Sequence, residues 1–145
     1  MILTKSEVEN IIPQKAPMVM VGALISIDEK QVVTDFVIPE DHILLENHKL
    51  SDVALIENIA QTAAVKAGYS AKINNEKPKT GFIGAVKNFE IFQSVGAGDK
   101  LTTTVNTVNE VFNASIVEGE IYCQQKCVAK GELKIFLVDE ENQNK

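Results

Sequence analysis

The chain has 145 residues, and 45% of them are hydrophobic, which is enough apolar material to fill the core of one domain without disulfides. The net charge of -6 argues against a nucleic-acid partner, because proteins that neutralise phosphates carry clustered Lys and Arg, and no such cluster is present. Cys123 and Cys127 make neither a disulfide framework nor a tetrahedral metal site with the two histidines of the chain. We expect one domain over residues 1–138, a polar tail over residues 139–145, and no metal or cofactor.

The sequence gives no sign of export or of a membrane span. Its N-terminal segment, MILTKSEVEN, lacks the basic segment, apolar core and cleavage site of a secretory signal. The most apolar stretch, residues 53–67, includes Glu57, Gln61 and Lys66 and falls short of the ~20 apolar residues that cross a bilayer. We therefore expect a cytoplasmic protein with no membrane partner.

The first predicted elements are a short helix, a hairpin and a loop. Residues 4–11 are typical of a helix, with Thr4 as its N-cap and acidic residues in its first turn. The segments MVMVGALISID (18–28) and QVVTDFVI (31–38) are rich in β-branched residues, so we expect two antiparallel strands. Residues 39–49 break this pattern with mixed polar and apolar residues, which predicts a loop.

A long helix follows, with Ser51 or Asp52 as its N-cap and an end near Gly68, which can adopt the left-handed turn after a helix. Apolar residues fall on one side of its helical wheel and polar residues on the other. The apolar side comprises Val53, Ile56, Ile59, Ala60, Ala63, Ala64 and Ala67, and the polar side comprises Glu57, Asn58, Gln61, Thr62 and Lys66. We expect the apolar side to be packed, with its alanines allowing a curved sheet to approach closely.

Four long strand-like segments complete the chain, with no second long helix among them. They are GFIGAVKNFEIF (81–92), KLTTTVNTVNEVF (100–112), SIVEGEIYCQ (115–124) and KCVAKGELKIFLV (126–138). Turn-forming residues separate them at 96–99, 113 and 124–125. The order of two strands, one helix and four strands favours an α+β fold, an antiparallel sheet packed on one helix, over an alternating βαβ design.

Three segments resemble the bacterial 3-hydroxyacyl-ACP dehydratases. ALIENIAQTAA (54–64) resembles the central-helix motif of that family. IIPQKAPMVMV (11–21) is similar to its Leu-Pro-x-Lys/Arg-x-Pro-Phe entry, and GFIGAVKNFEIFQSVGAGDKL (81–101) to the strand and turn that end in its Pro-Gly-Asp. The resemblance covers most of the chain and implies the hotdog fold, in which a curved antiparallel sheet wraps a long central helix.

The resemblance also implies a site and a partner. Hotdog dehydratases are dimers whose sheets join edge to edge, so we expect a homodimer or a heterodimer with another hotdog subunit. Each site combines a histidine of one subunit with a helix carboxylate of the other, and Glu57 is that carboxylate by motif. Gln61 matches the motif's Ala-Gln pair, and the helix start at Asp52 and Val53 matches the position that receives the thioester carbonyl. Free amides and the positive end of the helix dipole stabilise such an oxygen.

The chain departs from the family where the histidine is expected. The His-Phe-Pro-Gly segment and the Pro-Gly before the helix are replaced by ILLENHKLSD (43–52). His48 lies in this shortened loop close to the helix, and we name it as the catalytic base. His42 precedes Glu57 by nearly the separation found in the family and is the second candidate, while an ordinary loop histidine is the alternative for each.

Three functions are compatible with these features. The first is a lyase acting on 3-hydroxyacyl chains carried by acyl carrier protein or CoA, in fatty acid, aryl polyene or flexirubin-type pigment biosynthesis. The second is an acyl thioesterase in which Glu57 activates water or attacks the thioester carbonyl. The third is a non-catalytic subunit that partners an active hotdog dehydratase and has lost the histidine motif.

Overall fold

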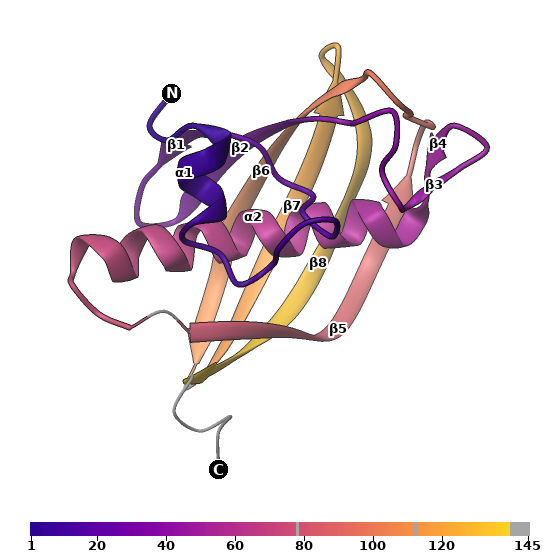
Figure 1. Ribbon diagram of the computed structural model, residues 1–145. Coiled ribbons are helices and arrows are strands. Elements are labelled where there is room, and N and C mark those ends of the chain that lie inside the picture. The colour runs from indigo at the N-terminus through magenta and orange to yellow at the C-terminus, as the bar shows by residue number, and fades with distance from the viewer. Residues whose placement is uncertain (78, 112, 140–145) are drawn as a thin grey trace.

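A computed structural model describes residues 1–77, 79–111 and 113–139. One antiparallel sheet of six strands curves around a single long helix, α2 (Asp52–Ile73), as Figure 1 shows. The order across the sheet is β1-β2-β6-β7-β8-β5, so β1 and β5 form its two edges. The strands are β1 (Leu24–Ile27), β2 (Gln31–Val37), β5 (Lys79–Ile91), β6 (Lys100–Val111), β7 (Ala114–Cys123) and β8 (Lys126–Asp139). This is the expected α+β hotdog arrangement.

The short N-terminal helix is confirmed as α1 (Lys5–Glu9). Thr4 and Glu7 form a capping box, in which the Thr4 hydroxyl accepts from the Glu7 amide and the Glu7 carboxylate accepts from the Thr4 amide. Val8 on this helix is fully buried in the core. The helix therefore closes one side of the molecule beside α2 (Figure 1).

The first sheet strand is shorter than expected. Strand β1 begins at Leu24, whereas the sequence pattern predicts a strand from Met18. Residues 18–20 are held by side chains of α2 instead of by a neighbouring strand, and this interaction takes them out of the regular ladder. A pattern of apolar residues cannot reveal this, because Val19 and Met20 are as buried here as they would be in a strand.

The long helix begins as expected but ends later. Ser51 is its N-cap, and its last residue is Ile73, more than a turn beyond Gly68. The glycine is needed for packing rather than for a left-handed turn, because a Cβ at position 68 would collide with the carbonyl oxygen of Ile11. The segment after α1 therefore lies directly against the backbone of α2.

The predicted loop before α2 contains a small hairpin of two short strands, β3 (Leu45–Glu46) and β4 (Lys49–Leu50). Its turn residues, Asn47 and His48, have positive φ angles of 52° and 67°, as a two-residue hairpin turn requires. A bridge between Lys49 and Gly96 ties the hairpin to the segment between β5 and β6. The hairpin thus lies next to the N-terminal end of α2 (Figure 1).

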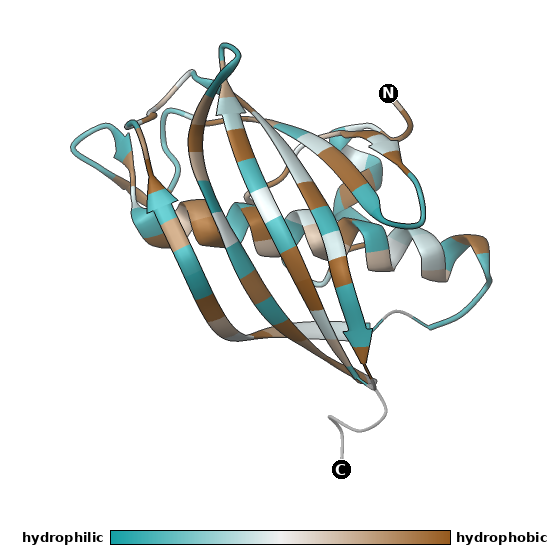
Figure 2. Ribbon diagram, turned by 180° about the vertical axis from the view of Figure 1, so that it is seen from behind, coloured by the Kyte–Doolittle hydropathy of each residue, from teal (hydrophilic) through white to brown (hydrophobic). Residues whose placement is uncertain are grey.

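The four C-terminal strands are confirmed and contain 10 to 14 residues each. Their predicted turns are also confirmed, with positive φ angles at Gly98, Asn113, Gln124 and Gln125. Figure 2 shows hydrophobic and hydrophilic residues alternating along these strands, as expected for a sheet with one face toward a core. Irregular pairing interrupts β5 at two places, and such bulges bend a strand.

The described part of the chain ends within the last strand. Asp139 still belongs to β8, one residue beyond the expected end of the domain, and the rest of the predicted tail lies outside the described residues. Across the described ranges, neither helix is both long enough and apolar enough to cross a bilayer.

Candidate active site

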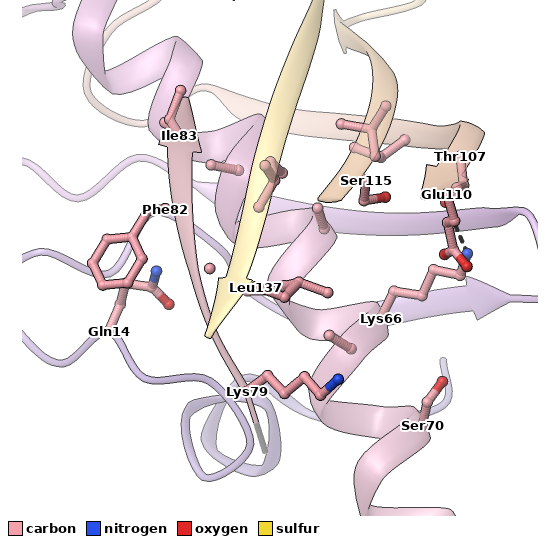
Figure 3. A pocket seen from close by; sticks show the side chains of 18 of the residues that line it. Gln14, Lys66, Ser70, Lys79, Phe82, Ile83, Thr107, Glu110, Ser115 and Leu137 are labelled. Carbon is pink, nitrogen blue, oxygen red and sulfur yellow. Dashed lines mark hydrogen bonds between the residues drawn. The ribbon is translucent and has the colours of Figure 1, made fainter. Parts of the chain in front are cut away.

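A cavity of about 580 Å³ lies between α2 and the concave side of the sheet, and Figure 3 shows side chains that line it. This volume is in the range of small-molecule binding sites, which extends over roughly 300–1,000 Å³. Its helix wall consists of Glu57, Ala60, Ala63, Ala64, Lys66, Ala67 and Ser70. Its apolar sheet wall includes Ile83, Val105, Val117, Ile135 and Leu137. Charged residues also line it, namely Glu57, Lys66, Glu76, Lys79 and Glu110, so the cavity has both apolar and charged walls.

The alanines of α2 do not have the role predicted from the sequence. They leave a cavity between the helix and the sheet, whereas we expected them to bring the two into close contact. Methyl side chains are too short to bridge the gap, and no larger side chain from the described part of the sheet fills it. The prediction that this side of the helix is the packed one holds for Ile59, which is fully buried, but not for the alanines, which are only partly buried, or for Val53, which is 62% exposed.

The opposite side of α2 is buried, and polar residues are buried there beside Ala54, Leu55 and Val65. Asn58, Gln61 and Thr62 are fully buried. Asn58 donates to the Met20 carbonyl at 2.7 Å and accepts from the Thr103 hydroxyl. Thr62 donates to the Asn58 carbonyl, and its hydroxyl also lies 2.8 Å from that of Thr34. Burial of these groups is tolerated because each finds a hydrogen-bond partner.

Gln61 links the irregular segment 18–20 to Glu57. Its Oε1 accepts from the Met20 amide at 2.6 Å, and its Nε2 donates to the Met18 carbonyl at 2.9 Å. The same Nε2 lies 3.1 Å from Glu57 Oε2 and donates to it. Gln61 is thus immobilised by backbone groups and orients the carboxylate one turn earlier on the helix.

Glu57 is half-buried and lines the cavity. One oxygen of its carboxylate is held by Gln61, and the other has no hydrogen-bond partner among the described residues. Its carboxylate also forms no ion pair with any described cation. A carboxylate held on one side and available on the other can accept or donate a proton at a ligand in the cavity.

The start of α2 is open in the protomer. The Ser51 hydroxyl accepts from the Ala54 amide, whereas the amides of Asp52 and Val53 have no acceptor among the described residues. The side chains of Asp52 and Val53 are exposed. Unpaired amides at a helix N-terminus, reinforced by the helix dipole, bind oxygen atoms that carry negative charge. This end of the helix can therefore receive a carbonyl oxygen.

The two histidines have different environments. His42 is buried, its Nε2 donates to the Val19 carbonyl at 3.1 Å, and its Nδ1 accepts from the Leu44 amide at 3.1 Å. Both ring nitrogens are therefore engaged with the backbone, which leaves neither free for a substrate. His48 is exposed at the β3–β4 turn, and its ring has no hydrogen bond or ion pair with a described residue. Within one protomer, His48 and Glu57 are not bonded to each other.

The cysteines do not contribute to this site. Burial raises the pKa of both thiols, Cys123 and Cys127, above the ordinary value, so that both remain protonated and weakly nucleophilic near neutral pH. Neither cysteine lines the cavity. Nucleophilic catalysis by a thiol therefore has no support from the structure.

The outer edge of β5 is long and apolar. This strand pairs only with β8, so the backbone groups along its other edge are unpaired within the sheet. Large apolar side chains on and just after it are exposed, namely Phe82, Ile83, Val86, Ile91 and Phe92. Soluble proteins seldom leave such an edge uncovered, because it pairs readily with another strand.

A family model described as ApeP-like, ApeP dehydratase, matches residues 6–145. The chain belongs to the ApeP-like dehydratase family. Two curated relatives agree with this assignment, and both carry the name 3-hydroxyacyl-[acyl-carrier-protein] dehydratase FabZ. The protein of Wolinella succinogenes is 26% identical over 97% of this chain and 99% of its own length. That of Aliarcobacter butzleri is 23% identical over 92% of this chain and 96% of its own length.

Solved structures confirm the hotdog fold of this ApeP-like chain. The dehydratase heterocomplex ApeI:P from Xenorhabdus doucetiae contains a chain with a TM-score of 0.86 and 21% identity, over 94% of both chains. A hypothetical thioesterase protein with coenzyme A from Streptococcus pneumoniae has a TM-score of 0.64 and 13% identity, over 80% of this chain and 87% of its own. At these identities the similarity shows the fold alone.

Proposed function

We propose that this ApeP-like protein acts on 3-hydroxyacyl thioesters and that Glu57 takes part in the removal of water from them. The observation that carries the proposal is the position of Glu57 on the wall of the cavity, with one carboxylate oxygen fixed by Gln61 and the other available. The names of the two curated relatives support the same substrate class. They also favour acyl carrier protein over CoA as the carrier of the acyl chain.

The proposed reaction uses Glu57 and the start of α2, one turn before it on the helix. The thioester carbonyl oxygen lies at the free amides of Asp52 and Val53, which stabilise the negative charge that develops when the α-proton is removed. One group accepts the α-proton, and a second protonates the departing 3-hydroxyl, so that the products are a 2-enoyl thioester and water. We assign these two tasks to Glu57 and to a histidine of the partner subunit, which in a homodimer is His48. The acyl chain extends along the alanines of α2.

A second hotdog subunit completes the proposed site. The exposed apolar residues of β5 and its free backbone edge favour a dimer in which two sheets join through β5. The related structure of an ApeI:P heterocomplex supports a heterodimer, while self-pairing through the same strand would give a homodimer. Exposed His48 has no partner among the described residues of its own protomer, as expected of a group that acts across an interface.

Two alternatives follow from specific observations. The similarity to a thioesterase fold supports an acyl thioesterase in which Glu57 activates water toward the thioester carbonyl. The missing His-Phe-Pro-Gly segment supports a non-catalytic subunit of an active dehydratase. Production of a free thiol identifies the thioesterase. Dehydratase activity that appears only after addition of a second hotdog chain identifies the non-catalytic subunit, provided that this activity survives loss of Glu57.

The pathway we propose is fatty acid, aryl polyene or flexirubin-type pigment biosynthesis.

The test is hydration of a crotonyl thioester by the wild-type protein and by Glu57→Gln, each alone and together with the products of the neighbouring genes. We expect Glu57→Gln to abolish turnover and to change the free energy of unfolding by no more than ~0.5 kcal/mol, because the side chain is only half-buried. Glu29→Gln, at an exposed turn, is the matched control and should retain full activity. Unchanged turnover by Glu57→Gln would exclude the proposed role.

A further inference from the structure

His42 is a buried histidine that the proposed reaction does not use. Its side chain is 9% exposed and stands nearly perpendicular to the Phe36 ring, with 6.1 Å between the two ring centroids. Both of its ring nitrogens have backbone partners. A buried ring with two specific hydrogen-bond partners is held in one orientation, so His42 can fix the position of the groups that it contacts.

The two backbone partners determine which ring nitrogen carries the proton. The Leu44 amide is a donor, so Nδ1, which lies 3.1 Å from it, accepts and carries no proton. The proton of the neutral ring is therefore on Nε2, which donates to the Val19 carbonyl at 3.1 Å. The Leu44 carbonyl in turn accepts from the amide of Ser51, the N-cap of α2. The ring is thus directed at Val19 from a loop that is anchored to the start of the helix.

Val19 is the middle residue of the segment that holds Gln61. The backbone groups on either side of it, the Met18 carbonyl and the Met20 amide, are the partners of Gln61 Nε2 and Oε1. Gln61 in turn donates to the Glu57 carboxylate. The histidine therefore holds from one side the same three residues that hold Gln61 from the other.

We propose that His42 is a positioning residue for Glu57. Its Nε2 proton anchors the segment 18–20, and the anchored segment holds the side chain that orients the carboxylate. This inference rests on the proposed function, because it concerns how the catalytic group of that function is held. Residues 18–20 belong to no strand, so loss of the anchor lets the segment move. A small displacement of a catalytic group costs a large factor in rate.

Two substitutions separate the roles of the two nitrogens, because a Gln amide reaches as far as Nε2 and an Asn amide only as far as Nδ1. His42→Gln keeps a donor for the Val19 carbonyl and loses the acceptor for the Leu44 amide, whereas His42→Asn does the reverse. We expect His42→Asn to lower kcat for hydration of a crotonyl thioester at least tenfold and to leave KM within about twofold, because Glu57 acts on the reacting atoms. His42→Gln should keep kcat within about threefold of the wild type.

The two variants control for each other. Each leaves one backbone group without its partner, so a purely structural role would destabilise both alike and leave the kcat of the folded molecules unchanged. Circular dichroism measures the folded fraction by which kcat is corrected. Asp41→Asn, an exposed neighbour in the same loop, should behave as the wild type. Wild-type kcat in His42→Asn, or an equal loss of kcat in both His42 variants, would overturn the inference.

Amide hydrogen exchange provides a readout that needs no turnover. The Met20 amide, which donates to Gln61, should exchange at least tenfold faster in His42→Asn than in the wild type, and at nearly the wild-type rate in His42→Gln. Unchanged exchange in His42→Asn would also overturn the inference. If the exchange rates differ as expected but no protein hydrates a crotonyl thioester, the proposed dehydration fails while the anchoring role of His42 stands.

His42→Ala is the second variant if His42→Asn does not fold. Its small side chain leaves space for water, which can pair with both the Val19 carbonyl and the Leu44 amide. A water molecule does not fix the segment as the ring does, so kcat should fall and Met20 exchange should rise as in His42→Asn. Wild-type values of both quantities in His42→Ala would contradict the positioning role.

Discussion

The two sides of α2 differ in a way that their composition does not reveal. The side with Asn58, Gln61 and Thr62 is buried and hydrogen-bonded, whereas the side with the alanines borders a cavity. Polarity alone therefore does not decide burial on this helix. A polar residue is buried where backbone and side-chain partners are available, and a small apolar residue can border open volume where no larger side chain faces it.

The two sides of the helix therefore have different roles. The polar side fixes the segment 18–20 and, through Gln61, the orientation of Glu57. The alanine side borders the cavity, and under the proposed function this is where the acyl chain would lie. A rigid support on one side and an open volume on the other are what a binding site on a helix requires.

The largest effect on stability is expected from a substitution on the buried side of α2. Asn58→Leu removes the partners of the Met20 carbonyl and the Thr103 hydroxyl, both in the interior. We expect the free energy of unfolding to fall by about 3 kcal/mol, since each unpaired buried group costs ~1–3 kcal/mol. Urea denaturation followed by circular dichroism measures this value. Lys72→Leu, at an exposed position of the same helix, should change it by no more than ~0.5 kcal/mol.

A loss below ~1 kcal/mol for Asn58→Leu would contradict this interpretation of the polar side. It would mean that the network around Asn58 is replaceable and that other contacts hold the segment 18–20 in place.

A smaller effect on stability is expected on the cavity side. Ala64→Leu adds a larger side chain to a surface that borders open volume, so we expect the free energy of unfolding to change by less than ~1 kcal/mol. The same substitution should weaken binding of octanoyl pantetheine amide by tenfold or more, because it occupies the cavity. Denaturation and calorimetry measure the two quantities. A destabilisation of about 2 kcal/mol or more, as overpacking produces, would instead support the close helix–sheet contact that the sequence predicts.

The smallest effect on stability is expected at the start of the helix. Val53→Asp places a negative charge at an exposed position in the first turn, where the helix dipole favours it by about 0.3–1 kcal/mol. The stability should therefore stay the same or rise slightly. Turnover of a crotonyl thioester should nevertheless fall severalfold, because the charge repels an oxygen that becomes negative. Val53→Asn is the neutral control, and equal turnover by the two variants would exclude this end of the helix as the carbonyl site.

Local sequence patterns were enough to predict the order and type of the main elements. The lengths of the C-terminal strands follow from their β-branched content, and their turns from Gly98, Asn113 and the two glutamines before β8. The start of α2 follows from its N-cap, Ser51. These features depend on interactions between residues close together in the chain, which is why a pattern along the sequence reveals them. Glu57 was likewise selected from its motif alone.

What each residue of α2 faces depends instead on contacts between distant parts of the chain. The need for glycine at position 68 depends on Ile11, the burial of Thr62 on Thr34, and the orientation of Glu57 on backbone groups of segment 18–20. Each of these contacts joins residues more than 25 positions apart, so no local pattern contains it. The cavity has the same origin, because open volume is a property of how the helix and the sheet meet and not of the alanines alone.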